Sequence, residues 1–213
     1  MRAYFQLVLR YRGLVLALIV LASGAGLWGL RSAVISSSLG KLFLANSPAY
    51  EKYLDRIREF GSDEQLIIAF EEEDVLSADA LRRLHSVTGR IAGIPQVATV
   101  RSILDNREVF RKTGKEGVEE VIEELASSPE KTEKARSKFL DDRFAAGIML
   151  SADSHHGAVL ITMPVEGSDS MEDTISLVDE ILGIFAQQGY SPQRLHQAGG
   201  IAIVAEMMEQ THF

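Results

Sequence analysis

The feature that most constrains this chain is a run of eighteen uncharged, mostly apolar residues near its start, GLVLALIVLASGAGLWGL, at positions 13–30. As an α-helix this run would be about 27 Å long, close to the roughly 30 Å hydrocarbon core of a bilayer. Arg12 precedes the run and Arg31 follows it. The run therefore predicts a transmembrane helix, and residues 1–31 are expected to form a cytoplasmic start and that helix.

A cleaved signal peptide is the alternative, because the chain begins with basic residues and the run contains small ones. The run is longer than the usual apolar region of about 7–15 residues, and its small residues lie inside it. A membrane-anchoring helix is therefore favoured over a cleaved signal peptide. Arg2, Arg10 and Arg12 precede the run without any acidic residue, which predicts a cytoplasmic N-terminus in a cell (inner) membrane and an extracytoplasmic location for residues 32–213.

Four small residues, Ala22, Ala25, Gly26 and Gly29, recur at spacings of three and four and therefore share one face of this helix. Such a face lets a neighbouring helix approach closely, so these four are predicted to be a helix-packing face. The alternative is that Gly and Ala are simply frequent in spanning helices.

Charge and cysteine content exclude several classes of function. The sequence has 22 basic and 30 acidic residues and a net charge of −8. Residues 1–31 hold four Arg and no acid, so the remainder carries 18 basic and 30 acidic residues, a net charge of −12. This argues against nucleic acid as a partner. The absence of Cys excludes disulfides, thiolate metal sites and a cysteine nucleophile.

After a connector, the sequence predicts a βαβ unit at residues 65–103. The apolar segment QLIIAF at 65–70 predicts a strand, and residues 96–103 alternate as a second strand. Between them a helix begins at Ser77 and carries its apolar residues on one face. These residues are Leu81, Leu84, Val87 and Ile91.

A second unit of the same order is predicted at residues 157–198. Its strands are expected at 157–164 and 195–198, and Gly199-Gly200 separates the second from a C-terminal helix at 201–212, expected to lead toward a second transmembrane helix. The helix between the strands carries apolar residues at steps of three and four, which predicts that they face the core. These residues are Met171, Ile175, Val178, Leu182 and Phe185.

The two units together predict an α+β class, with a split-βαβ (ferredoxin-like) sheet in which the units pair antiparallel. Residues from about 107 to 144 are highly charged and interrupt the pattern. They predict a helical insertion outside the core, with its charges on a solvated face.

No pattern predicts catalysis, a cofactor or a metal. Asp153, His155 and His156 are expected in a turn, because adjacent histidines point in different directions and make a poor pair of ligands. The acidic run 71–74 lacks the alternating donors and central Gly of a calcium loop, so a solvated strand end is expected. Catalytic, cofactor-binding and metal-ligating residues are predicted to be absent.

The order of these elements resembles the N-terminal segment of the resistance–nodulation–division (RND) superfamily of exporters, and its branch of MMPL-like hydrophobe exporters. The apolar run 13–30 contributes to this resemblance, and four further segments do so as well. They are DEQLII at 63–68, IPQVATVRS at 94–102, GIMLSAD at 147–153 and GGIA at 199–202.

The resemblance implies a piece of a proton-driven exporter of lipids or other hydrophobic compounds, comprising the first spanning helix and the first porter domain. Its implied partners are the lipid bilayer, the remaining transmembrane helices, a second porter domain and a hydrophobic substrate, with an oligomer possible in that family. The proton-relaying acidic group of such exporters has no counterpart in residues 1–213. The alternative is a complete, single-pass protein whose exported domain binds a ligand or a partner.

Overall fold

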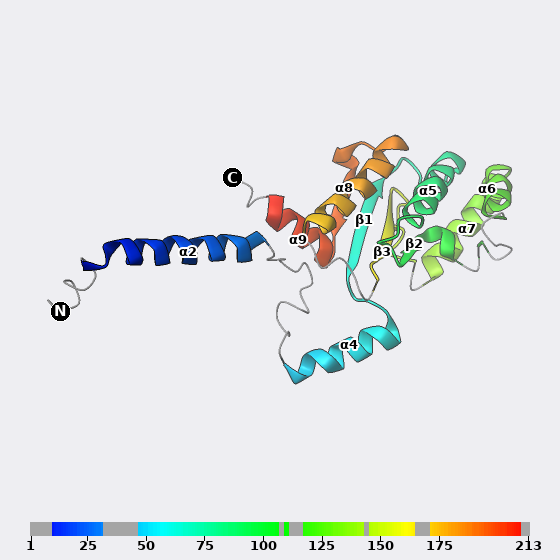
Figure 1. The fold of residues 1–213 in the computed structure, drawn as a ribbon. Helices are drawn as coiled ribbons and strands as arrows, with labels where there is room; N and C mark the ends of the chain where they lie inside the picture. The colour runs from blue at the N-terminus through cyan, green and yellow to red at the C-terminus, as the bar shows by residue number, and fades with distance from the viewer. Residues whose placement is uncertain are drawn as a thin grey trace. The chain divides into compact units, whose positions relative to one another are not determined.

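The computed structural model describes residues 10–31, 47–106, 109–110, 117–142, 145–164 and 171–209. The chain divides into two compact units, Met1–Ile35 and Ser36–Phe213. In the first unit the structure describes helix α2 (Arg12–Arg31), and in the second an α+β domain (Figure 1).

Helix α2 corrects the prediction of a transmembrane helix at residues 13–30. Among the residues that the structure describes, no helix combines the length and the apolarity needed to cross a membrane. Ser23, Gly24 and Gly26 occupy the middle turns of α2 and contribute little apolar surface there. The prediction of a single-pass, inner-membrane location is wrong on the same finding.

The α+β class is confirmed by a sheet with strand order β2-β3-β1-β4, in which every neighbouring pair is antiparallel. The strands are β1 (Gln65–Glu71), β2 (Thr99–Arg101), β3 (His156–Thr162) and β4 (Leu195–Ala198). Helix α5 (Ala78–Ile91) connects β1 to β2, and α8 (Met171–Gln187) connects β3 to β4. Each helix therefore joins two strands that have another strand between them, which is the split-βαβ arrangement.

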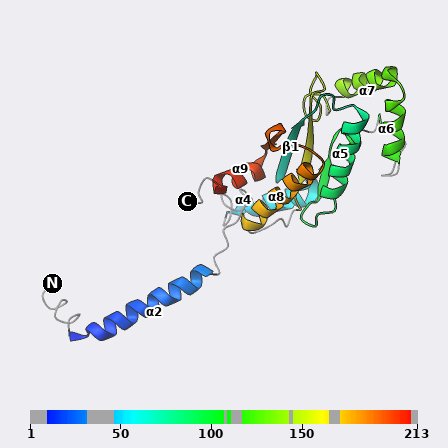
Figure 2. The same cartoon turned by 90° about the horizontal axis from the view of Figure 1, so that it is seen from above.

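One face of β1 forms the centre of the core. Leu66, Ile68 and Phe70 alternate along the strand and are almost fully buried, whereas the residues between them are half-buried. Figure 2 shows α5 and α8 side by side over the sheet. The Phe70 ring lies against Gly157 of β3. A Cβ at position 157 would overlap the ring, so this position requires glycine.

The buried face of α8 is rotated from the one that its sequence predicts. Val178 and Phe185 are buried as expected, but Leu182 is only partly buried. The residues that complete the buried face are Leu177, Ile181 and Ile184. The helix contacts α5 and α9 as well as the sheet, so its apolar surface is broader than a single stripe.

The charged insertion does not lie outside the core. Its helices are α6 (Val118–Ala126) and α7 (Pro129–Asp141), and α6 packs against α5. Ile122 and Phe139 are fully buried and belong to the same apolar cluster as the sheet. Each helix has a buried apolar face, and its charged residues lie on the exposed sides.

The remaining described elements are two helices and two short turns. They are α4 (Pro48–Phe60), two short 3₁₀ turns (Ile103–Asp105 and Pro192–Arg194) and α9 (Gly200–Glu209). Gly199 has φ +99° and lies so close to the Gln65 carbonyl that a Cβ would overlap it, which fixes the start of α9. Residues 1–9, the connector 32–46 and positions 210–212 of the predicted C-terminal helix lie outside the described residues.

Candidate functional site

The predicted helix-packing face lies on α2. Ala22, Ala25, Gly26 and Gly29 are exposed, and a Cβ added at either glycine would meet no atom within 4 Å. The face is thus open among the described residues. Its role in helix packing stays a prediction.

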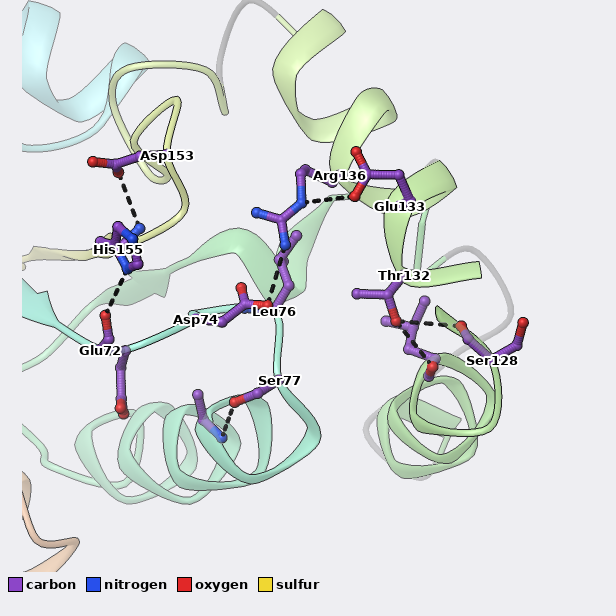
Figure 3. Close-up of polar contacts among 12 residues, drawn as sticks. Glu72, Asp74, Leu76, Ser77, Ser128, Thr132, Glu133, Arg136, Asp153 and His155 are labelled. Carbon is purple, nitrogen blue, oxygen red and sulfur yellow. Dashed lines mark hydrogen bonds and ion pairs between the residues drawn. The ribbon is translucent and has the colours of Figure 1, made fainter. Parts of the chain in front are cut away.

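The acidic run at residues 71–74, which begins with the last residue of β1, is engaged in ion pairs. Glu71 Oε1 lies 3.2 Å from His196 Nε2. Asp74 Oδ2 accepts a hydrogen bond of 3.1 Å from Arg136 of α7, which anchors the insertion to the loop after β1 (Figure 3). Through these contacts the acidic run connects β1 to β4 and to α7.

Asp153 and His155 lie in a turn before β3, as predicted, whereas His156 is the first residue of β3 and not part of the turn. The His155 backbone N–H donates to Asp153 Oδ1 at 3.0 Å, and Ser154 adopts φ 59°. A hydrogen bond from Ser151 and that from the His155 N–H lower the pKa of the Asp153 carboxyl. The turn also accepts a 2.9 Å hydrogen bond from Val75 N–H at the Ser154 carbonyl. Figure 3 shows this turn beside the loop that leaves β1.

A charged cluster connects the two βαβ units behind that loop. Arg83 of α5 donates to Glu72 Oε1 at 2.7 Å, and the Glu72 side chain is 11% exposed. The Arg83 guanidinium also lies 5.9 Å from the Tyr190 ring centroid, and the Tyr190 ring packs edge-on against Phe70. Burial, followed by the charge of Glu72, raises the pKa of the Tyr190 phenol. The contacts among Arg83, Glu72 and Tyr190 are explained by the packing of the folded domain.

Within the described ranges, no three His, Cys, Asp or Glu side chains are grouped so that they would hold a metal ion. His156 and His196 both approach Glu71, at 4.0 and 3.2 Å, and the three residues form a polar border on the sheet. The domain also has two surfaces that contain apolar residues.

The first of these surfaces is the sheet face opposite the buried one, which we call the open face. Its centre is apolar, since Ile67 pairs with Leu160 on β3 and with Ala198 on β4. Ala69 pairs with Ala158 in the next row. The border is polar and consists of Gln65, Thr99, Arg101 and Thr162 at one end and Glu71, His156 and His196 at the other.

The second surface is a groove along the outer edge of β4, with a volume of about 900 Å³. All four residues of β4 line it, and because alternate residues of a strand face opposite sides, the groove must follow the strand edge. Its walls come from α8 and α9. They are lined by Ile175, Val178, Asp179 and Leu182 on α8 and by Ala202, Ile203, Ala205, Glu206 and Met207 on α9.

Sequence reasoning missed both surfaces. For the open face a signal was present, because the strand QLIIAF is apolar at Ile67 and Ala69 as well as at its core positions. A strand with one solvated face would alternate instead. For the groove there was no local signal, since it depends on the rotation of α8 and the direction of α9.

Comparisons with known proteins identify no family. No protein-family model matches the sequence, and a search of curated proteins finds no match. The resemblance to RND exporters therefore stays a prediction.

Proposed function

We propose that the α+β domain is a non-catalytic, substrate-guiding domain of an RND-type exporter, and that hydrophobic compounds contact its open face. The observation that carries this proposal is the apolar centre around Ile67, Ala69 and Leu160, which is half-buried and bordered by polar residues. The split-βαβ strand order agrees with the porter domain that the resemblance implies.

An apolar patch with a polar border suits an amphiphilic compound. Burial of apolar surface contributes about 25 cal/mol per Å² to the free energy of binding, so the compound can be bound without being chemically changed. Contiguous apolar patches with polar rims commonly mark interaction sites. The compound's chain would lie across Ile67 and Leu160, and its polar group would reach Arg101 at one end or Glu71 and the two histidines at the other.

The test is photo-crosslinking of the full chain with a fatty acid that carries a diazirine on its chain. Within residues 47–209, cross-links are expected on the peptides that contain Ile67 and Leu160. Ile67→Glu should reduce them at least fivefold, because it places a charge in the apolar centre. Ile148→Glu is the matched control, since Ile148 is an exposed residue off this face, 53% exposed. Equal labelling of all exposed apolar residues would contradict the proposal.

A partner-binding domain is the second candidate function. It is favoured by the groove along β4, where an unpaired strand edge and two apolar walls occur together.

A further inference from the structure

Among the described residues, the outer edge of β4 lacks the charged residues, proline and bulge by which many proteins protect a strand edge. Such edges commonly carry Lys, Pro, a bulge or an inward-pointing charge. The β4 sequence, Leu195-His196-Gln197-Ala198, has no Lys, Arg, acid or Pro, and its register with β1 is continuous. The opposite edge, β2, carries Arg101 in a three-residue strand. The two edges of the same sheet therefore differ in their protection.

The groove beside this edge is built to accept side chains. On the α9 wall, Ile203 is 56% and Met207 63% exposed, although large apolar side chains are normally covered. On the α8 wall, Leu182 is partly buried and faces the same groove. An antiparallel or parallel strand laid against β4 would project alternate side chains toward these walls.

The charges at the groove identify one further property of an occupant. Asp179 on α8 is exposed and lines the groove. Among the described lining residues there is no Lys or Arg. A basic side chain in the occupant would therefore complement the groove.

We propose that the outer edge of β4 and its groove bind an extended segment of a partner polypeptide. The segment pairs with β4 as a fifth strand, places alternate apolar side chains against α8 and α9, and sets a lysine or arginine near Asp179. Strand addition of this kind draws affinity from main-chain hydrogen bonds and specificity from pockets for alternate side chains. This inference goes beyond the proposed function and uses a different surface.

Two other occupants fit the observations less well. A second copy paired through β4 would bring the acidic side chains of both grooves together, and like charges in contact oppose association. A small apolar molecule would leave the main-chain donors and acceptors of the β4 edge unsatisfied by the ligand.

The experiment titrates the ¹⁵N-labelled full chain with the peptide acetyl-Val-Thr-Lys-Thr-Val-amide, whose valines and lysine share one face of a strand, and follows amide chemical shifts. Saturating shifts are expected in β4 and α9. Two isomers of the peptide, N-methylated on one strand edge or on the other, are the controls. One isomer should bind like the parent peptide and the other at least tenfold more weakly, because methylation removes the donors that face β4.

Two variants test the charge component. Asp179→Asn should weaken binding about threefold or more, whereas Glu180→Gln, next to it but outside the groove, should leave binding unchanged. The inference is overturned if the peptide causes no shifts while the spectrum shows a folded chain, or if both methylated isomers bind equally. It is also overturned if the free chain is a dimer with its β4 amides already protected from exchange. None of these outcomes affects fatty-acid labelling of the open face. Failure of this inference can therefore be distinguished from failure of the proposed function.

Discussion

The two βαβ units have the same order of elements but are held in different ways. In the first, β1-α5-β2, ion pairs connect the helix and its preceding loop to neighbouring elements, through Arg83–Glu72 and Arg136–Asp74. The insertion α6–α7 adds a second layer against α5. In the second, β3-α8-β4, the helix is held by apolar residues such as Ile181 and Phe185, and the edge strand borders a groove.

The comparison shows that two units with similar hydrophobic patterns can differ in what lies beside their edge strands. Both units bury one helix face, so both satisfy the same requirement for a core. Ion pairs and the insertion reinforce the first unit, whereas the edge strand of the second unit borders a groove.

The largest expected effect comes from breaking the apolar packing of the second unit. Ile181→Asp places an unpaired carboxylate at a fully buried position, which is expected to cost several kcal/mol and unfold the domain. Leu182→Asp is the matched control and should be much milder, because Leu182 lines the groove and is only partly buried. Circular dichroism during urea unfolding measures both. Equal losses would show that the assigned buried face of α8 is incorrect.

A smaller loss is expected when the charge cluster of the first unit is broken. Glu72→Gln keeps the shape of the side chain but removes the charge that Arg83 contacts. Arg83 is 37% exposed and retains water, so the cost should be about 1–2 kcal/mol, within the range for hydrogen bonds to charged groups. Urea unfolding at neutral pH provides the measurement. Glu73→Gln changes the adjacent, exposed residue and should shift stability by less than about 0.5 kcal/mol.

An alkaline pH series tests the contact between the units at Tyr190. Its pKa is raised in the folded chain by burial and then by Glu72, whereas an unfolded tyrosine titrates near pH 10. Below about pH 10 both states keep the proton. Above it the unfolded state loses the proton first, so the free energy of unfolding falls as pH rises. Tyr190→Phe should flatten this fall between about pH 10 and 11. An unchanged slope would argue against the buried phenol, provided that Tyr53, whose pKa is also raised, is intact.

The smallest effect is expected at the surface contact between α5 and the insertion. Arg82 Nε lies 2.8 Å from Glu119 Oε1, but both side chains are more than 40% exposed. Arg82→Ala should therefore lower the urea midpoint only slightly, and the loss should shrink as salt is added. Urea midpoints at low and high salt give the comparison. A loss as large as that of Glu72→Gln, independent of salt, would mean that the insertion depends on this pair.

The order of strands and helices was predictable because each element carries a local period. Leu81, Leu84, Val87 and Ile91 repeat at helical spacing and are all buried on α5. The rotation of α8 was not predictable, because its apolar residues surround more than one side and tertiary neighbours select which are covered. The prediction of a transmembrane helix was wrong because it relied only on the length of the run 13–30 and on its lack of charge.

The candidate surfaces were less accessible to sequence reasoning than the fold. The open face combines residues of three strands, including Ile67, Leu160 and Ala198, and their proximity depends on strand register. Register is set by long-range pairing and is not encoded in any one segment. The turn at Asp153–His155 was predictable, because its composition is local.

The central position of β1 has a consequence for synthesis of the chain on the ribosome. Gln65 pairs with Thr162 and Ile67 with Ala198, so both neighbours of β1 are made only after the insertion has been translated. Until then the segment Leu66 to Phe70 is an unpaired apolar strand, the kind of segment that aggregates or recruits chaperones. Helices α5, α6 and α7 bury apolar residues against one another and precede β3 in the chain. An early helical cluster would shelter one side of β1 while the nascent chain waits for its remaining strands.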